Sequence, residues 1–401
     1  MNKTFAVLGA GMQGTAAAYD LAKFADPAHI LLGDMSLHQA QKSAERVNSL
    51  LDRLVCVPMQ VDALDPESLG GWMSKADVLL SCVPYYLHTK VAATAIRSGV
   101  DMVDLGGNTP VTMATLEMDA EARQAGVTLV PDTGLAPGLV NSIGAWLIEQ
   151  LDEAQSVRLY CGVLPQNPIP PFNYKLTFNV EGLVTEYDYE AVVLRDGEIR
   201  MVETLDELEE IHIDELGTME AFTTSGGTST APYTFHGRVR DYEYKTIRFP
   251  GHCHLMRAYK DFGLWREDEV EVKGVKVRPK DVFCRVFGEE LAKIQDLDQC
   301  AVRGVGIGLK DGEKVRLQVD VFDRQCPETH FTSMERLTGF SMAIYAASIA
   351  RGEVPRGCVR YELAMSGARF LEEIQRRGVK VRFSEERLPS VAEIQTDRVS
   401  R

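Results

Sequence analysis

The sequence predicts an α/β fold: a Rossmann-type, doubly wound parallel sheet into which an α+β domain, built on a mostly antiparallel sheet, is inserted. Three observations in the 401 residues support this prediction. Short apolar segments alternate with segments of helical period up to about residue 135. The glycine-rich stretch VLGAGMQG lies between the first apolar segment and the first helical one. Later in the chain, two Asp-Gly pairs each separate runs of alternating polarity, a pattern typical of antiparallel hairpins.

The first part of the chain contains candidate strands of nearly continuous apolar character. Parallel strands that helices cover on both faces have this character, because they are buried on both sides. Right-handed crossovers between them produce the doubly wound arrangement. The expected strands are Phe5–Leu8, His29–Leu32, Val55–Val61, Asp77–Cys82, Met102–Leu105 and Thr128–Pro131, and the expected helices include Ala16–Phe24, His38–Leu51 and Leu87–Ser98.

The segment after Gly138 has a different pattern. A helix over Val140–Leu151 leads into alternating segments, among them YKLTFNVEG and YEAVVLRDGEIRMVE, and the second of these turns at Asp196–Gly197. The stretch VGIGLKDGEKVRLQVDVFD predicts another hairpin at Asp311–Gly312, and the spaced glycines of RGVGIGLKDG predict a bend before it. We therefore expect a mostly antiparallel sheet with a few helices, one of them over Asp281–Gln295.

The chain becomes helical again in MERLTGFSMAIYAASIARGEV, which begins at Met334. Small and apolar residues lie nearly all round this helix, which predicts burial on every side. We expect it to pack on the first domain, so that the middle domain is an insertion. The predicted spans are 1–138 for the first domain, 139–332 for the middle domain, 333–383 for the helical return and 384–401 for a polar tail.

The stretch VLGAGMQG has the spacing G-x-G-x-x-G after a strand and before a helix, which is the context that a dinucleotide requires. Gly9 allows the sharp turn, Gly11 lets a pyrophosphate approach the backbone, and Gly14 lets the helix pack close to the strand. Met12 and Gln13 lie at the helix start, where free N–H groups bind an anion. No Gly-Lys-Ser/Thr follows, which excludes a P-loop. The first domain is therefore expected to bind a dinucleotide.

Asp34 ends the second strand, twenty residues beyond Gly14. A carboxylate at this place accepts hydrogen bonds from both ribose hydroxyls of an adenosine and repels a 2′-phosphate. The three residues after Asp34 include no Arg or Lys that could hold such a phosphate. The site therefore favours NAD over NADP. The alternative is an ordinary glycine-rich turn in an unrelated α/β protein, with Asp34 capping a helix.

Residues after the other strands are expected to line the same crevice, because ligands bind at the carboxyl edge of such sheets. Each of them could equally be an ordinary loop residue. The candidates are Asp62, on the adenine side, and Ser81, Cys82, Val83, Pro84, Gly106 and Gly107, around the second ribose and the nicotinamide.

Composition excludes several classes of protein. The formal net charge of −15 argues against nucleic acid or an anionic membrane as a partner, since both favour a surplus of Lys and Arg. No run approaches the ~18 apolar residues that span a bilayer. The 8 cysteines show no CxxC pair or regular spacing, which suits a reducing compartment. Because the N-terminus enters a strand at once, we expect no signal peptide and a cytoplasmic protein.

Four longer stretches resemble the saccharopine dehydrogenase-like family, and within it the lysine 6-dehydrogenase branch. They are DTGLAPGLVN (132–141), LPQNPIPPFNYKLTFNVEGLVTEY (164–187), EAFTTSGGTSTAPYTF (220–235) and EYKTIRFPGH (243–252). These motifs are far more specific than the glycine spacing, and the resemblance extends through MERLTGFSMAIYAASIARGEV. One departure is Val163, where family members often carry a second glycine before Leu-Pro.

The resemblance implies NAD-dependent oxidative deamination of the ε-amine of L-lysine. Hydride leaves the ε-carbon, the imine hydrolyses to the semialdehyde and ammonia, and the semialdehyde cyclises to piperideine-6-carboxylate. The alternative is a saccharopine or carboxynorspermidine dehydrogenase that acts on a secondary amine, whose additional carboxylates should require more than one arginine. A third possibility is a nucleotide-binding regulator without turnover. We expect a homodimer, because an antiparallel sheet in a middle domain commonly supports one.

Hydride leaves only a carbon that bears a neutral amine, and a lysine ammonium titrates near ~10.4. The site must therefore either bind the rare neutral form or remove a proton, and a general base with a tuned pKa would help. Lys175 is one candidate, since a cationic neighbour lowers the pKa of a buried lysine. Glu181 is another, either as the base or as an anchor for a substrate ammonium. Tyr174 and His252 are possible proton relays. Lys175 and Glu181 lie in what reads as an alternating strand, so both could instead be solvated surface residues.

The substrate carboxylate requires a fork of donors, which favours Arg248, helped by Thr224 and Ser225 in the segment TSGGTST. The alternative for Arg248 is an ion pair with an acidic neighbour such as Glu243. His252 and His254 would share one face of a strand, but a zinc site needs three or four ligands. Because no convincing further ligand is present, we expect no metal.

Overall fold

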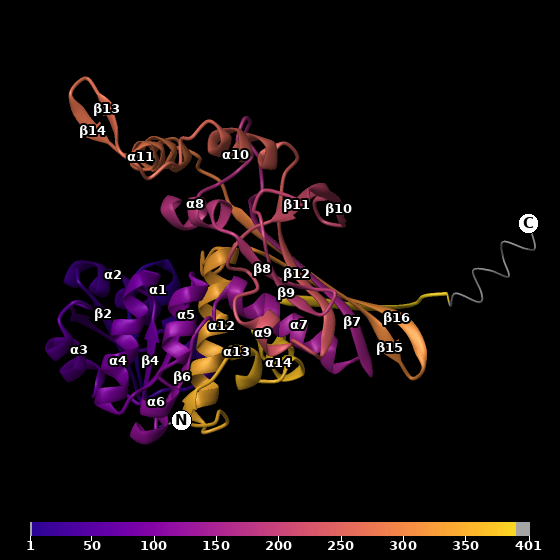
Figure 1. The fold of residues 1–401 in the computed structure, drawn as a ribbon. Coiled ribbons are helices and arrows are strands. Elements are labelled where there is room, and N and C mark those ends of the chain that lie inside the picture. Colours follow the sequence, from indigo (N-terminus) through magenta and orange to yellow (C-terminus); the bar gives the residue numbers. More distant parts are fainter. Residues whose placement is uncertain (1, 390–401) are drawn as a thin grey trace, which may run out of the picture. The chain divides into compact units, whose positions relative to one another are not determined.

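The computed structural model describes residues 2–389, and the chain divides into two compact units (Figure 1). Within the described residues, unit 1 spans 2–142 and 324–379, and unit 2 spans 143–323 and 380–389. Unit 1 is thus assembled from two parts of the chain, and the sequence of unit 2 lies mostly between them. The boundaries expected from the sequence alone were 138/139, 332/333 and 383/384.

Unit 1 contains a seven-stranded sheet in the order β3-β2-β1-β4-β5-β6-β17, and every pair of neighbours in it is parallel. This is the doubly wound order, with one added strand at the β6 edge. The six strands expected from the sequence are confirmed. The seventh has only two residues and gave no apolar run. The strands are β1 (Thr4–Leu8), β2 (His29–Asp34), β3 (Cys56–Gln60), β4 (Val78–Ser81), β5 (Asp101–Asp104), β6 (Thr128–Val130) and β17 (Gly357–Cys358).

The helices of unit 1 come from both ends of the chain, as the indigo and orange ribbons of Figure 1 show. The return helix α12 packs against α1, as predicted. The approach is close at Gly339, where a Cβ atom would lie 2.8 Å from Ala16 Cβ. The helices are α1 (Met12–Phe24), α2 (Leu37–Leu51), α3 (Pro66–Met73), η1 (Tyr85–Leu87), α4 (His88–Ser98), α5 (Thr109–Leu116), α6 (Asp119–Ala125), η2 (Leu135–Leu139), α12 (Ser333–Ala350), α13 (Tyr361–Ala364) and α14 (Gly367–Arg376).

Unit 2 contains a nine-stranded, mostly antiparallel sheet in the order β10-β11-β12-β7-β15-β16-β18, with β8 paired to β12 and β9 to β8. Among the pairings of the described residues in this sheet, β7–β12 is the parallel one. Both Asp-Gly hairpins are confirmed, and positive φ angles at Asp196, Gly197, Asp311 and Gly312 suit their tight turns. The strands are β7 (Glu153–Pro165), β8 (Ala191–Arg195), β9 (Glu198–Val202), β10 (Glu209–Ile213), β11 (Gly217–Thr223), β12 (Val239–Arg248), β15 (Asp298–Lys310), β16 (Glu313–Arg324) and β18 (Lys380–Arg387).

The remaining elements of unit 2 are helices, of which the first begins in the last residues of unit 1, and a small separate hairpin. The helix expected over Val140–Leu151 is confirmed as α7, and that over Asp281–Gln295 as α11. No described helix is both long and apolar enough to cross a membrane. The elements are α7 (Val140–Glu149), α8 (Val180–Asp188), α9 (Ala231–Thr234), α10 (His252–Asp261), β13 (Val270–Val272), β14 (Val275–Val277) and α11 (Pro279–Ala292).

Three expectations for unit 2 were wrong. YKLTFNVEG is not a strand: residues 173–177 have no regular structure, and α8 then begins because Asn179 caps it by accepting a 2.6 Å hydrogen bond from Gly182 N. RGVGIGLKDG does not form the expected bend: residues 303–310 belong to β15, which has only a register shift between Ile307 and Gly308, and a Cβ on Gly304 would lie 2.4 Å from Ile143 Cγ2. The expected tail begins inside a strand, because β18 pairs with β16, while residues 390–401 lie outside the described part.

Candidate functional site

The glycine loop between β1 and α1 is tightly packed at Gly9 and Gly14 and has open space at Gly11. Gly9 has a φ of +99°, and a Cβ on it would lie 2.8 Å from Cys82 O. A Cβ on Gly14 would lie 1.9 Å from Gly9 O, so the helix can approach the strand only with glycine there. A Cβ on Gly11 would meet nothing within 4 Å, and no side chain caps the start of α1 at Met12. Open space beside uncapped N–H groups fits a dinucleotide phosphate.

Asp34 lies beside this loop. Its Oδ2 accepts a 2.9 Å hydrogen bond from Ala10 N, and its Oδ1 accepts a bond of the same length from Ser36 N. The helix α2 is capped by Ser36 rather than by Asp34, which removes the alternative explanation for the carboxylate. The next residue, Met35, is exposed and carries no charge that could attract a 2′-phosphate. A carboxylate fixed here suits a ribose diol.

The other predicted cofactor residues differ in exposure. Ser81 is fully buried, and its hydroxyl forms a 3.2 Å hydrogen bond with His88 Nδ1 inside the protein. The backbone of Cys82 lies against Gly9, and burial raises the pKa of the Cys82 thiol to about 12. Asp62 is exposed and closes its own turn by accepting from Leu64 N. The rest are half-buried or exposed at strand ends: Val83, Pro84, Gly106 and Gly107.

A second group of polar side chains lies in unit 2. Arg248, at the end of β12, donates from Nε to Tyr187 Oη at 3.0 Å. Tyr187 Oη is in turn 3.1 Å from His252 Nε2, and His252 Nδ1 is 3.1 Å from Phe172 O. Since a carbonyl only accepts, Nδ1 carries the proton and Nε2 accepts from the tyrosine. The three side chains form one directed, fully buried chain of hydrogen bonds.

Burial and the guanidinium set the charge state of this chain. Burial, with the nearby Arg248 charge, lowers the pKa of His252 to about 3, so the imidazole is neutral at ordinary pH. Burial also raises the pKa of Tyr187 far above its usual value, although Arg248 opposes this. Arg248 itself stays charged. His252, which we expected as a proton relay, has both ring nitrogens occupied by protein groups.

Tyr174 and Glu186 complete the surroundings of Arg248. The guanidinium carbon lies 5.2 Å from the centre of the Tyr174 ring. The Tyr174 hydroxyl is buried and, like that of nearby Thr177, has no well-formed hydrogen bond among the described residues. Glu186 Oε2 lies 4.0 Å from Arg248 Nη2. Burial raises the pKa of Glu186 to about 7 despite this cation, although 34% of its side chain is exposed.

The two residues expected as bases do not join this cluster. Among the described residues, no hydrogen bond or ion pair links the side chain of Lys175 or Glu181 to Arg248. Lys175 is half-buried near Asp296, whose pKa it helps to lower. Glu181 is exposed in the first turn of α8. The strand on which both were placed is absent, because the segment is a loop followed by a helix.

The segment TSGGTST uses its donors within the protein. Thr224 Oγ1 is 2.7 Å from Thr246 Oγ1, and Ser225 Oγ donates to Thr185 O. Ser225 N also donates to Glu186 O at 2.8 Å, which fixes the end of α8. A Cβ on Gly227 would lie 2.2 Å from the Tyr244 ring, so the loop needs glycine there. The two hydroxyls expected to bind substrate thus hold the neighbouring backbone and side chains.

Two further alternatives can be resolved. Glu243 pairs with Arg158 and Arg195 and not with Arg248. His252 begins the helix α10, so it does not share a strand face with His254. Within residues 2–389, no three His, Cys, Asp or Glu side chains come together as a metal site would require.

Sequence reasoning missed Glu186 and Tyr187, although both stand in the motif NVEGLVTEY. Tyr187 follows the buried Leu183 by four residues, so the helical period of α8 places both on one face. That period would have indicated a buried tyrosine and an adjacent carboxylate, had the segment been read as a helix.

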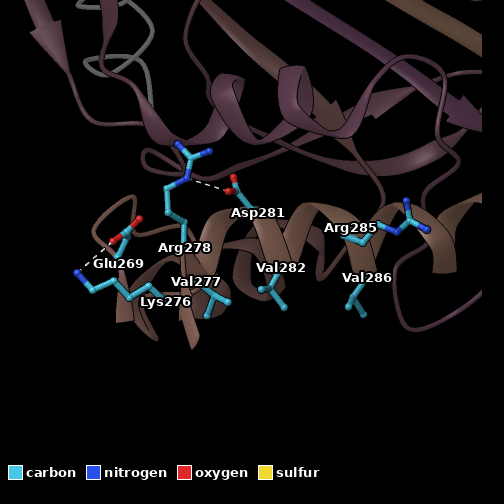
Figure 2. Close-up of a pocket in the computed structure, with 8 residues that line it drawn as sticks. All are labelled: Glu269, Lys276, Val277, Arg278, Asp281, Val282, Arg285 and Val286. Carbon is cyan, nitrogen blue, oxygen red and sulfur yellow. Dashed lines mark hydrogen bonds and ion pairs between the residues drawn. The ribbon is translucent and has the colours of Figure 1, made fainter. Parts of the chain in front are cut away.

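A pocket of about 420 Å³ lies on α11 and the β13–β14 hairpin of unit 2, and Arg248, Tyr187 and His252 do not line it. Figure 2 shows valine side chains along one side and ion pairs between Lys276 and Glu269 and between Arg278 and Asp281. None of the predicted site residues lines it. The lining residues are Glu269, Lys276, Val277, Arg278, Asp281, Val282, Arg285 and Val286.

Comparison with known families matches nearly the whole chain. The family model described as "Saccharopine dehydrogenase NADP binding domain" matches residues 5–130. The model described as "Saccharopine dehydrogenase C-terminal domain" matches residues 134–379.

Individual proteins are similar at a lower level. The "Saccharopine dehydrogenase [NADP(+), L-glutamate-forming]" of Saccharomyces cerevisiae is 23% identical over 248 residues, which cover 60% of this chain and 55% of that protein. The enzyme of the same name from Pyricularia oryzae is 23% identical over 249 residues, again 60% and 55%. The chain thus spans about half the length of these curated relatives. The apo yeast saccharopine dehydrogenase (L-Glu forming) has the same fold, with a TM-score of 0.78 at 18% identity over 96% of this chain and 100% of that one.

Proposed function

The chain belongs to the saccharopine dehydrogenase family, and from this premise we propose that it oxidises the ε-amine of L-lysine with NAD. The choice of substrate rests on one observation: the cluster in unit 2 contains a single buried arginine, Arg248, beside the carboxylate of Glu186. It is the one arginine whose side chain contacts Tyr174, Tyr187 or His252 among the described residues. A single buried guanidinium suits a substrate with one carboxylate.

NAD is the cofactor that the residues of unit 1 favour. Asp34 would accept the adenosine ribose hydroxyls and repel a 2′-phosphate, and Gly11 would leave room for the pyrophosphate at the start of α1. When bound, NAD accepts the hydride.

The residues of unit 2 would hold the amino acid. Arg248 would bind its carboxylate, with the Tyr174 ring packed on the guanidinium. Loss of hydride from the ε-carbon gives an imine, and water converts this imine to the semialdehyde and ammonia. The proton of the lysine ammonium must first leave. Lys175 and Glu181 stay predictions for that role, since neither contacts Arg248.

The second candidate function is oxidation of a secondary amine such as saccharopine. Two observations favour it: the relatives named above are saccharopine dehydrogenases, and the matching domain model is described as NADP-binding. Such a substrate would bring more than one carboxylate to the single arginine of the cluster and to Glu186, so charge disfavours it.

A panel of substrates tests these proposals. L-Lysine, its decarboxylated diamine, saccharopine and other amino acids are each supplied with NAD or NADP, and cofactor reduction is followed by absorbance. We expect reduction with L-lysine and NAD, and a cyclic imine that an aldehyde-reactive aromatic amine detects. Turnover of saccharopine without turnover of lysine would replace the first candidate by the second, and silence with every substrate would favour a regulator.

We also propose that the chain forms a homodimer through the β13–β14 hairpin and α11. A two-stranded hairpin is marginal by itself, and Val275 (62% exposed) and Val286 (55% exposed) lie uncovered on it and on α11. In a two-fold dimer the same surface of both subunits meets. The surface formed by α11 and the hairpin carries charges of both signs, among them Glu269 and Arg285, so opposite charges could pair across such a contact. Light scattering should show Val275→Asp to be monomeric, whereas Leu54→Asp, at an exposed site in unit 1, should stay dimeric. A wild-type monomer would refute the proposal.

A further inference from the structure

Two opposite charges in unit 2 lie close together without a hydrogen bond between them. Arg248 Nη2 and Glu186 Oε2 are 4.0 Å apart. The other nitrogens of Arg248 are engaged, since Nε donates to Tyr187 Oη and Nη1 donates to Ile247 O at 3.0 Å. Nη2 makes no hydrogen bond to any residue of the described part. One donor and one carboxylate therefore lie 4.0 Å apart, and neither makes a side-chain hydrogen bond among the described residues.

The position of Glu186 is fixed by the protein around it. It lies in the last turn of α8, and its carbonyl accepts from Ser225 N at 2.8 Å. Its neighbour Tyr187 ties the same turn to Arg248 and His252. The carboxylate is thus presented by a helix that two separate contacts hold in place.

We propose that Glu186 and Arg248 together bind the α-amino acid head of the substrate, Arg248 Nη2 holding the α-carboxylate and Glu186 holding the α-ammonium. This inference rests on the proposed function only in taking an amino acid as the substrate. The two charged groups of such a head are attached to one carbon, so their partners must lie within a few ångströms of each other. The ε-amine of lysine lies at the far end of the side chain, too far away to share this pair with the carboxylate. Glu186 is therefore a binding residue for the head and not the base at the reacting end.

The charges around Glu186 give this binding a pH dependence. The groups that act on Glu186 or respond to its charge are Arg248, Tyr174, Tyr187 and Tyr244, and His252, behind Tyr187, is neutral. Arg248 is thus the one permanent charge among them. Because burial raises the pKa of free Glu186 to about 7, the carboxyl is partly protonated near neutral pH. An ammonium ligand requires the carboxylate, so affinity should rise with pH through this range and binding should release a proton.

The pair also predicts which ligands are excluded. An amine without an α-carboxylate leaves Arg248 buried and unpaired, and an N-acetylated amino acid leaves Glu186 without a cation. Both losses weaken binding, the first more than the second, because the Arg248 side chain is buried while 34% of the Glu186 side chain is exposed. A second carboxylate near the head would be repelled by Glu186.

The test uses L-norleucine, which has the amino acid head of lysine and no ε-amine, so it binds without being oxidised. Its dissociation constant is measured by calorimetry on the full chain at about pH 6 and about pH 8, where the pKa predicts an affinity gain of about tenfold. Glu186→Gln should weaken binding at the higher pH and abolish the gain. Glu190→Gln, which changes an exposed carboxylate just beyond α8, should leave the affinity at the higher pH and the gain in affinity with pH unchanged.

Several outcomes would overturn the inference: no norleucine binding at the higher pH, equal affinity at both pH values, or a pH gain that survives in Glu186→Gln. N-Acetyl-norleucine binding as tightly as norleucine would also overturn it. A Glu186→Gln variant that binds norleucine normally but loses turnover would assign Glu186 to the reacting amine instead. Since norleucine is not oxidised, normal head binding together with absent lysine turnover would reject the proposed function and leave this inference standing.

Discussion

The glycine loop of unit 1 and the Arg248 cluster of unit 2 are built in opposite ways. The shape of the loop depends on backbone conformation and on close contacts between backbone atoms. Gly9 and Gly14 allow the tight turn, and Gly11 leaves space at the start of α1. In the cluster, side chains from the loop before α8, from α8 itself, from β12 and from α10 converge on one guanidinium. The first depends on residues close together in the sequence, and the second on residues far apart.

Because of this difference, substitutions in the two regions should impair different properties of the protein. A change in the loop should affect the cofactor or the fold of unit 1. A change in the cluster should affect the amino acid substrate and leave cofactor binding intact.

The largest effect is expected for Arg248→Met. Removing a buried charge that binds a carboxylate costs about 2–5 kcal/mol, or roughly 30- to 4000-fold in kcat/KM for the amino acid. NADH binding, followed by fluorescence, should be unchanged. Arg158→Met is the matched control, because Arg158 lies on β7, pairs with Glu243 and is more than half exposed. Weakened NADH binding in Arg248→Met would break the contrast.

The glycine loop offers a matched pair. Gly14→Ala places a Cβ against Gly9 O, and overpacking of this kind costs about 1–3 kcal/mol. The melting temperature should therefore fall by about 2–4 °C per kcal/mol. Gly11→Ala meets no protein atom, so it should melt like the wild type while NAD affinity falls about tenfold. Equal melting temperatures for both variants would contradict the geometry of the turn.

Asp34→Ala should change the choice of cofactor. Without the carboxylate, a 2′-phosphate is no longer repelled, and the ratio of kcat/KM for NAD over NADP should fall by about tenfold. The matched control is Asp62→Ala, which removes an exposed carboxylate after β3. An unchanged ratio in Asp34→Ala would show that this carboxylate does not face the ribose.

The smallest effect is expected for Tyr187→Phe. The loss of one hydroxyl removes the link between Arg248 Nε and His252 Nε2 and should cost about 1 kcal/mol, or roughly fivefold in KM for the amino acid. The kcat value should hold, because the tyrosine positions the arginine. Tyr189→Phe, two residues further on and exposed, is the control. A large fall in kcat with constant KM would instead place Tyr187 in the proton path.

The sequence predicted unit 1 well for a physical reason. Its strands are short apolar runs buried on both faces, and the glycine loop and Asp34 have fixed spacings that follow from the turn itself. The two Asp-Gly hairpins of unit 2 were predictable in the same way, because the turn requires positive φ angles at adjacent residues.

The cluster could not be predicted because tertiary contacts define it. Nothing local to Arg248 shows that Tyr187, 61 residues earlier, accepts from it. The alternation of YKLTFNVEG suggested a strand, whereas the cap at Asn179 makes a helix begin there. That one error placed Lys175 and Glu181 in a strand that does not exist and concealed the helix that carries Glu186.

The most direct test of the proposed reaction follows deuterium from L-lysine into the reduced cofactor. With lysine deuterated at the ε-carbon, we expect deuterated NADH and release of ammonia in equal amount. With lysine deuterated at the α-carbon, we expect unlabelled NADH. Transfer from the α-carbon, or no transfer from lysine beside ready transfer from saccharopine, would contradict the proposed reaction.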